Sequence, residues 1–309
     1  MGTPAFAAES LSAVLDAGHH VVAAVTRPDA HAGRGLKPRP PAVKLVSAHR
    51  GVPILQPEAL ESPGFLESVE ALAPEVLVVV AFGRLLKPPL LDMAPHGAIN
   101  VHASLLPKLR GASPIVWAIA RGERETGVTT MRLARRLDAG DILLQRSTPI
   151  GEHETAGELE RRLAVLGGEL LVKTLEALEQ GRLTSTPQDE RLATWAPSLR
   201  KDDGVIDWGM PAAEIACRVR AFDPWPAART RINPPTGIGL RLFMAQVADL
   251  PARGTRPGEI LDPPGLVVAC GDGTALAVGE VQPEGRRRMK ASEAFSGRYL
   301  KPGDLLGGR

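Results

Sequence analysis

The sequence predicts an α/β protein with a Rossmann-like N-terminal domain on a mostly parallel sheet and a smaller C-terminal β-barrel domain of OB-like type. Three observations support this fold class. Helical and strand patterns alternate through the first half of the chain. Residues 76–82 are apolar throughout, which is typical of a central strand that is buried on both faces. After residue 201, short β-like runs follow one another between glycine and proline turns.

The first half contains successive βα units. Helical patterns cover residues 8–17, 42–49, 65–72 and 114–120, and strand patterns cover residues 21–25, 52–55, 76–82, 98–102 and 128–133. Gly18 and Gly51 follow the first two helical patterns, where glycine commonly ends a helix. A longer amphipathic stretch over residues 154–179 has leucines at helical spacing and ends at Gly181. We expect this helix to complete the first domain.

A change of pattern marks the end of that domain. Periodicity is lost between residues 184 and 201, and prolines interrupt the segment, which is typical of a linker or a strapping loop. Strand patterns then cover residues 241–247, 266–270 and 276–281, and one helical pattern covers residues 212–220. We therefore expect one domain over residues 1–182, a linker over 183–200 and a β-barrel domain over 201–309.

Composition excludes several classes of protein. The 37 Lys and Arg residues against 35 Asp and Glu residues give a net charge of +2, which excludes a histone-like or polybasic protein. Cys217 and Cys270 stand far apart without a CxxC motif, so neither a disulfide framework nor a metal site is expected. The longest apolar run is much shorter than the roughly 20 residues that cross a bilayer. We expect a cytoplasmic, monomeric protein that holds no metal and does not bind a membrane.

A polar pair, Asn100 and His102, interrupts the apolar strand pattern at 98–102. Residues two apart on a strand point to the same face, and ligands of open α/β sheets gather at the carboxyl ends of strands. The residues alone leave two interpretations open. The pair either belongs to a site, or caps the strand and bonds to nearby backbone.

The surrounding string N-x-H-x-S-L-L-P-x-x-R-G, over residues 100–111, resembles the signature of the folate-dependent formyltransferases. Further segments stand in the order and spacing of that family, namely residues 2–7, 27–35, 79–83, 137–143, 206–208 and 220–226. The resemblance therefore covers nearly the whole chain.

The resemblance implies transfer of a formyl group from 10-formyltetrahydrofolate to the α-amine of methionine carried by initiator tRNA. Negative charge develops on the formyl oxygen as the amine attacks, and preorganised donors stabilise such charge. By resemblance, Asn100 and His102 supply these donors. Asp138 either accepts the amine proton through water or orients His102. On its residue type alone, Asp138 beside Gly140 would be a turn carboxylate.

The resemblance also implies where the folate binds. The residues expected to contact it are Ser104, Leu105, Leu106, Pro107, Phe82 and Gly83. The family more often has tyrosine at the position of Phe82. Arg110 has two open interpretations, as an anchor behind the site or as a solvated loop residue.

Two basic segments are candidates for contact with tRNA. Taken alone, charged segments of this kind are usually solvated surface, but the resemblance to a tRNA enzyme favours phosphate contacts that position the nucleic acid. The residues expected to bind tRNA are Arg34, Lys37 and Arg39 in the first segment and Arg286, Arg287, Arg288 and Lys290 in the β-barrel domain.

Two other functions compete with this one. A formyltransferase acting on the amine of a sugar nucleotide shares the same catalytic motifs, whereas the two basic segments favour tRNA. A catalytically silent RNA-binding protein of the same fold is the second alternative, and the intact motifs disfavour it.

The beginning of the chain departs from the resemblance. The family has a short strand before the turn at residues 2–4, whereas this sequence begins at Met1. An interior strand is therefore expected to be missing, which would leave backbone groups of its neighbours unpaired. We expect a few apolar residues before Met1 to restore it.

Overall fold

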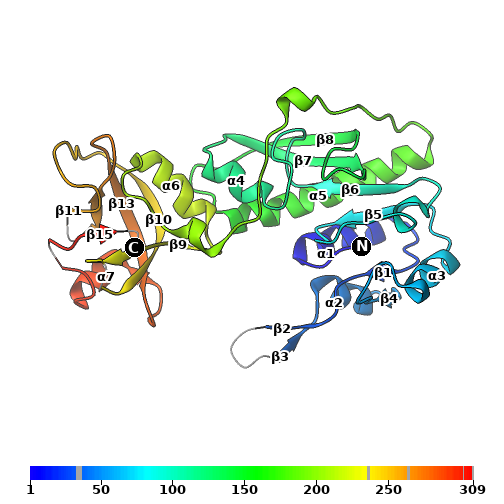
Figure 1. Ribbon diagram of the computed structural model, residues 1–309, viewed down its shortest axis with the longest axis horizontal. Coiled ribbons are helices and arrows are strands. Elements are labelled where there is room, and N and C mark those ends of the chain that lie inside the picture. The colour runs from blue at the N-terminus through cyan, green and yellow to red at the C-terminus, as the bar shows by residue number, and fades with distance from the viewer. Residues whose placement is uncertain (33–36, 235–236, 263–264, 302, 308–309) are drawn as a thin grey trace. The chain divides into compact units, whose positions relative to one another are not determined.

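The computed structural model describes residues 1–32, 37–234, 237–262, 265–301 and 303–307 (Figure 1). It divides into two compact units. Unit 1 contains Met1–Pro114, Glu125–Pro149 and Glu160–Pro197, and unit 2 contains Ile115–Arg124, Ile150–Leu159 and Ser198–Arg309. Unit 1 has α/β structure with parallel strand pairs and unit 2 has a curled antiparallel sheet, which confirms the predicted fold class.

The main sheet of unit 1 has the strand order β5-β6-β7-β8. Its strands are β5 (Leu77–Val80), β6 (Ala98–His102), β7 (Glu125–Arg132) and β8 (Ile142–Pro149). The pair β5 and β6 is parallel, whereas β7 runs antiparallel to both β6 and β8. Strand β6 matches the predicted range, and β8 has no counterpart among the predicted strands.

A second, parallel pair consists of β1 (Ala24–Val25) and β4 (Ile54–Leu55). The first two residues of the chain lie between this pair and β5. The Gly2 amide donates to the Val25 carbonyl at 2.9 Å, and Gly2 forms a parallel bridge with Val80. Met1 and Gly2 thus occupy the place where the sequence analysis expects an interior strand.

A cavity of about 1300 Å³ adjoins this place. Residues 21–23 and 76–78 line it from the two sides, and the predicted strand over 21–25 is shortened to the two residues of β1. Because residues 21–23 have no ladder partner there, they do not form a strand.

Helices cover the sheet strands of unit 1. They are α1 (Ala5–Asp16), α2 (Ala42–His49), α3 (Pro63–Ala71), the short η1 (Leu90–Asp92) and the long α5 (Ala156–Glu179). A Cβ added at Gly168 of α5 would lie 2.9 Å from the Cβ of Ala13, so the glycine allows α5 and α1 to pack closely. A hairpin of β2 (Ala30–Ala32) and β3 (Lys37–Arg39) lies in the basic segment.

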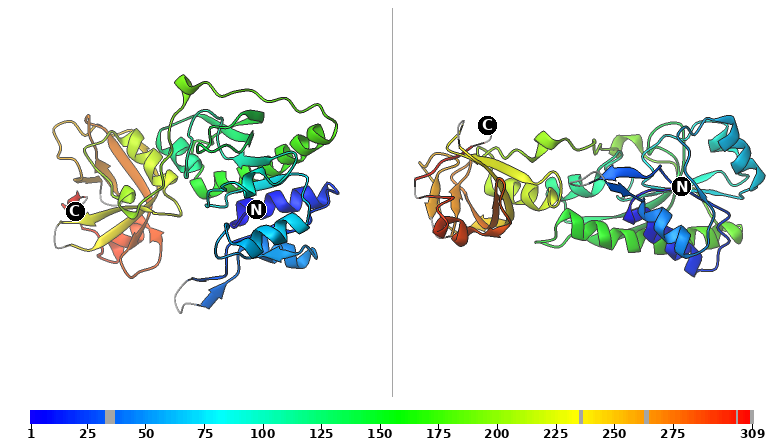
Figure 2. Two further views of the ribbon diagram at one scale, coloured as in Figure 1. Left: turned by 45° about the vertical axis from the view of Figure 1, so that its right-hand side comes forward. Right: turned by 90° about the horizontal axis from the view of Figure 1, so that it is seen from below.

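Unit 2 has a curled antiparallel sheet with the order β11-β12-β13-β10-β9-β15, to which β14 is added beside β13 (Figure 2). The strands are β9 (Ala228–Ile232), β10 (Gly239–Ala248), β11 (Ile260–Asp262), β12 (Val267–Ala269), β13 (Ala275–Pro283), β14 (Met289–Lys290) and β15 (Leu306–Gly307). A bridge between Glu259 and Leu305 connects the two ends of this order. Helices α6 (Ala212–Ala221) and α7 (Ala291–Ser296) complete the unit, and α4 (Pro114–Ala120) begins at the boundary between the units.

Residues 186–196, which we call the strap, belong to unit 1. The strap is the long coil that carries the 3-10 turn η2 (Glu190–Leu192). Thr186 and Ile142 exchange two backbone hydrogen bonds of 2.9 Å. At the other end of the strap, the Arg110 amide donates to the Thr194 carbonyl, and the Ala196 amide donates to the Arg110 carbonyl. Backbone hydrogen bonds therefore connect the strap to the loop that follows β6 and to the end of the loop that follows β7.

Candidate active site

Asn100 and His102 lie on β6, between β5 and β7. They share one face of the sheet because they are two residues apart. Asn100 is paired in register with Val79 on β5 and with Met131 on β7. His102 is the last residue of the strand and is 6% exposed. The polar pair thus stands in the middle of the sheet, where the strand gives way to a loop.

The side-chain amide of Asn100 makes no hydrogen bond with any residue that the structure describes. The residue is half-buried. Its NH₂ group therefore remains available as a donor to a ligand at this edge.

His102 lies between two acceptors. Its Nε2 donates to the carbonyl of Leu109 at 2.9 Å, and its Nδ1 lies 3.8 Å from Oδ2 of Asp138. A carbonyl and a carboxylate can only accept, so each nitrogen of the ring faces an acceptor. The contact with Leu109 also fixes the plane of the ring.

Asp138 lies in the loop between β7 and β8 and is 9% exposed. Its backbone φ is +48°, which is the left-handed region that few residues other than glycine adopt. Its Oδ2 accepts a hydrogen bond of 2.9 Å from the Gly111 amide. The carboxylate is thereby tied to the end of the loop that follows His102. The neighbouring Asp141 accepts a hydrogen bond of 3.1 Å from the Ser185 hydroxyl.

The segment of Ser104, Leu105, Leu106 and Pro107 is held by two polar side chains of the antiparallel strands. The Thr129 hydroxyl on β7 donates to the Ser104 carbonyl at 2.6 Å and accepts from the Leu106 amide at 3.2 Å. Gln145 on β8 donates to the Leu106 carbonyl at 2.8 Å and to the Thr129 hydroxyl at 2.9 Å. The backbone of the expected folate segment is therefore fixed before any ligand binds.

Phe82 and Gly83 differ in their surroundings. The Phe82 ring is 2% exposed and packs in the core of unit 1 with Val25 and Phe65, among others. Gly83 has a φ of +68°, and its carbonyl accepts from the Arg27 guanidinium at 2.6 Å. Phe82 thus shapes this part of the sheet edge from within the core. The expected contacts of both residues with folate stay predictions.

Arg110 is fully buried, with 0% exposure. Its guanidinium donates to Oε1 of Gln188 at 2.8 and 3.0 Å and to the carboxylate of Glu190 at 3.0 and 3.1 Å. These hydrogen bonds, first those from Arg110 and then that from Arg136, hold the pKa of Glu190 below its ordinary value. Of the two interpretations that the sequence left open, the structure therefore supports the anchor.

Sequence reasoning missed four residues that build this site. They are Thr129, Gln145, Gln188 and Thr194, which hold the backbone of the site loops through their side chains. Each lies far along the chain from the loop that it contacts. Thr and Gln in strands or coil carry no motif, so only the fold could reveal these contacts.

The basic segment near the N-terminus is described only in part. Arg34 lies outside the described residues, and Lys37 and Arg39 belong to β3. Beside the hairpin, Lys44 donates to the Asp29 carboxylate at 2.8 Å. Hydrogen bonds from Gln56 and then Lys44 lower the pKa of Asp29. The contacts expected between Arg34, Lys37, Arg39 and tRNA stay predictions.

The basic segment of unit 2 contains side chains with different surroundings. Arg288 lies 4.0 Å from the centre of the Phe243 ring and pairs with both Glu280 and Asp223. The Arg286 guanidinium lies 5.6 Å from the centre of the Tyr299 ring. Arg287 and Lys290 are exposed, and Arg287 approaches the Glu293 carboxylate at 3.8 Å. Arg288 therefore contributes least free positive charge, whereas the tRNA contacts of this segment stay predictions.

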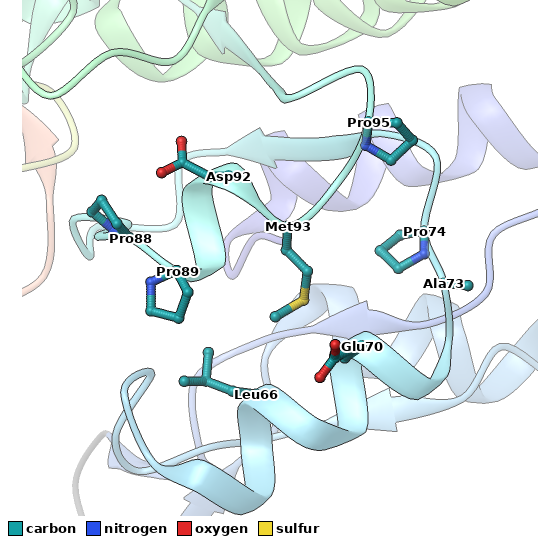
Figure 3. Close-up of a pocket in the computed structure, with 9 residues that line it drawn as sticks. All are labelled: Leu66, Glu70, Ala73, Pro74, Pro88, Pro89, Asp92, Met93 and Pro95. Atoms are coloured by element: carbon teal, nitrogen blue, oxygen red, sulfur yellow. The ribbon is translucent and has the colours of Figure 1, made fainter.

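A pocket of about 950 Å³ lies between α3 and η1 (Figure 3). Leu66, Met93 and four prolines line it, together with the carboxylates of Glu70 and Asp92. None of the candidate catalytic residues contributes to its lining. Within the described part of the chain, no group of three or more His, Cys, Asp or Glu residues is arranged to hold a metal ion, and no helix is long and apolar enough to cross a membrane.

Comparison with known families identifies both halves of the chain. A model described as formyl transferase matches residues 1–175, and a model described as formyl transferase, C-terminal domain, matches residues 198–299. Methionyl-tRNA formyltransferase of Pelobacter propionicus is 46% identical over 310 residues, which cover 100% of this chain and 95% of that protein. The protein of the same name from Anaeromyxobacter dehalogenans is 49% identical over 300 residues, covering 96% of this chain and 95% of the relative.

Solved structures share the fold at lower sequence identity. HypX from Aquifex aeolicus in complex with tetrahydrofolic acid has a TM-score of 0.58 and 22% identity, and the match covers 82% of this chain and 44% of that one. WlaRD, a sugar 3N-formyl transferase crystallised with dTDP and 5-N-formyl-THF, has a TM-score of 0.65 and 17% identity, with 93% and 97% coverage. At these identities the likeness concerns the fold alone.

Proposed function

The chain belongs to the formyl transferase family, and we propose that it transfers the formyl group of 10-formyltetrahydrofolate to the α-amine of methionine on initiator tRNA. Relatives that are 43 to 49% identical over nearly the full chain carry the name methionyl-tRNA formyltransferase. They support tRNA over a sugar nucleotide as the formyl acceptor. In the reaction, the amine nitrogen bonds to the formyl carbon while the bond from that carbon to the folate nitrogen breaks. The amine loses one proton and the folate nitrogen gains one.

The observation that carries the proposal is the open Asn100 amide beside His102. Both stand on one face at the end of β6, and the Asn100 amide has no partner among the described residues. A donor that is not already paired within the described residues can stabilise the negative charge that develops on the formyl oxygen. His102 stands on the same face, with Nε2 held by the Leu109 carbonyl and Nδ1 facing Asp138, so its ring releases one of these contacts when it donates to the substrate.

Asp138 gives this site its proton acceptor. The carboxylate lies 3.8 Å from Nδ1 of His102, and within the described part of the chain it accepts a single hydrogen bond, from the Gly111 amide. Its remaining lone pairs are free to take the proton of the attacking amine through water.

The remaining residues provide binding surfaces. We propose that Ser104, Leu105, Leu106 and Pro107, whose segment is already held by Thr129 and Gln145, contact the folate together with Phe82 and Gly83. The side chains proposed to contact tRNA phosphates are Arg34, Lys37 and Arg39, with the exposed Arg286, Arg287, Arg288 and Lys290. Contacts of this kind position the nucleic acid and make its affinity dependent on salt.

The test offers the protein 10-formyltetrahydrofolate labelled in the formyl group. The acceptors are methionyl-initiator tRNA, the same tRNA without methionine, and a dTDP-linked amino sugar, and transferred label is counted after each is separated. We expect label only on the methionyl-tRNA. Transfer to the sugar would replace the proposal by the first alternative. Binding of tRNA without transfer to any acceptor would establish the silent RNA-binding protein.

A further inference from the structure

The strap joins the two loops that carry the candidate catalytic groups. One end pairs with Ile142, directly after the loop that holds Asp138. The other end pairs with Arg110, and the Thr194 hydroxyl accepts from the Leu109 amide at 2.8 Å. Leu109 is the residue whose carbonyl accepts from His102. The strap therefore binds the backbone of Leu109, which holds His102, and the backbone of Ile142, which follows the Asp138 loop.

Gln188 stands between these two ends and uses its whole side-chain amide. Its Nε2 donates to the Asp138 carbonyl at 2.9 Å and to the Gly140 carbonyl at 2.7 Å. Its Oε1 accepts twice from Arg110, at 2.8 and 3.0 Å. An amide group has two N–H donors and two acceptor lone pairs, so every one of them is occupied.

The orientation of this amide is fixed by chemistry. Arginine can only donate, and a backbone carbonyl can only accept. A flipped Gln188 amide would face Arg110 with its NH₂ group and the two carbonyls with its oxygen, and all four hydrogen bonds would be lost. Arg110 is itself fully buried and held by Glu190. A connected network thus runs from Glu190 through Arg110 and Gln188 to the backbone of Asp138.

The loop needs this support because of its backbone conformation. Asp138 has a φ of +48°, a left-handed conformation that costs energy in most residues with a Cβ and that Asp adopts only occasionally. At Gly140, an added Cβ would overlap the Arg132 carbonyl, so only glycine allows the loop to lie this close to the end of β7. Two carbonyls of one tight loop face the strap at once, and the Gln188 NH₂ group serves both. A side chain without this group would leave the loop free to turn its carbonyls to water.

We propose that Gln188 is a positioning residue that sets the Asp138 carboxylate relative to His102 through the backbone of residues 138–140. The proposal rests on the role of Asp138 in the proposed function. Displacement of a reacting group by about 1 Å can cost about 10²-fold in rate. Protein groups occupy every hydrogen-bonding position of the Gln188 amide, so its loss lowers kcat while the KM values for folate and tRNA stay nearly unchanged.

The test uses Gln188→Glu, which keeps the size of the side chain and an acceptor for Arg110 but removes both donors. We expect kcat to fall by about 10- to 100-fold with each KM within about twofold of the wild type. Gln188→Leu serves as the second variant if Gln188→Glu does not fold. Arg191→Ala is the matched control, because Arg191 lies in the same strap, is exposed, and donates from its guanidinium to the carboxylate of Asp189. It should keep wild-type kinetics.

The same substitution in an Asp138→Asn background separates positioning from general damage. If Gln188 acts through the carboxylate, then adding Gln188→Glu to Asp138→Asn lowers kcat less than twofold further. An equal loss in both backgrounds, or a rise of KM instead of a fall of kcat, would overturn the proposal. Failure of the proposed function is distinguishable, because the wild type itself would then not formylate methionyl-tRNA. Wild-type turnover of Asp138→Asn would instead remove the role of Asp138.

Discussion

Nδ1 of His102 lies 3.8 Å from Oδ2 of Asp138, and both residues are buried. Each side chain also makes a hydrogen bond with the backbone of the loop that follows His102. The Leu109 carbonyl accepts from His102, and the Gly111 amide donates to Asp138. One loop therefore sets both members of the pair. The separation of these two side chains at the end of β6 is therefore set by the protein itself.

This arrangement predicts the effect of removing the catalytic groups. Asn100→Ala, His102→Ala and Asp138→Ala should each lower turnover by about 10² to 10³, because their contacts strengthen only as charge develops in the transition state. Folate binding, measured by calorimetry, should change little. Near-normal turnover of His102→Ala at saturating substrates would contradict the site.

The buried Arg110 predicts how stability responds to acid. Hydrogen bonds from Arg110 and then Arg136 lower the pKa of Glu190 below its ordinary value of 4.5. The unfolded chain then binds the proton more readily, so this contribution to stability is present above pH 4.5 and is lost as the pH falls through the lower pKa of the folded state. Glu190→Gln should flatten the fall of the melting temperature between pH 5 and pH 3. An unchanged acid profile in that variant would argue against the pairing.

The β6 strand and the motif string after it could be predicted because their signals are local. Residues 98–102 alternate apolar and polar side chains beside an apolar neighbour strand, and β6 follows this range. The burial of Arg110 could not be predicted, since it depends on Gln188 and Glu190, which are separated from it by 78 and 80 positions. A charged residue in a loop is normally solvated, and only a partner from a distant segment changes that.

The β8 strand could not be predicted from the sequence either, because it too depends on a distant segment. Residues 142–149 alternate too weakly to indicate a strand, and four of the eight residues are exposed. The strand forms because β7 offers a free ladder edge for antiparallel pairing over most of its length. Its Gln145 then reaches the folate segment. Pairing between segments, rather than propensity within them, determines this part of the site.

Substitutions in the basic segment of unit 2 should affect either tRNA binding or stability, depending on the surroundings of each side chain. Arg287→Ala and Lys290→Ala should weaken tRNA binding with little change in melting temperature, because both side chains are exposed. Arg288→Ala should instead lower stability, by about 1 to 2 kcal/mol, because it loses a contact with the Phe243 ring and two ion pairs. Filter binding and thermal unfolding measure the two effects. A loss of stability in Arg287→Ala would reverse the assignment.

Arg34 predicts a salt-dependent effect. If it contacts a phosphate of single-stranded acceptor RNA or of the stem, Arg34→Ala should reduce the slope of log affinity against log salt by about 0.7 to 0.9. Folate binding and folding should be unaffected. Formylation rates across a salt series give the measurement, and identical slopes for the variant and the wild type would remove Arg34 from the tRNA surface.

The last prediction concerns Met1, whose amine donates to the Val78 carbonyl at 2.6 Å. Burial lowers the pKa of this amine from 8.0 to about 5. Between these values the unfolded chain carries the proton and the folded chain does not, so the free energy of unfolding decreases as the pH falls from 8 to 5. The difference of three pKa units corresponds to about 4 kcal/mol. The 309-residue chain should therefore lose melting temperature over this range, in addition to any contribution from histidines.

An extension before Met1 tests this together with the cavity beside it. Six added residues, alternately valine and threonine, convert the buried amine into an amide and can pair with residues 21–23 and 76–78, which line the cavity from its two sides. We expect the melting temperature to rise by several degrees, at about 2 to 4 °C for each kcal/mol of unfolding free energy gained. We also expect the melting temperature to depend less on pH. Six glycine and serine residues form the matched control, because they also remove the buried amine but add no apolar strand. Equal melting temperatures for the two extensions would show that the cavity does not accept a strand.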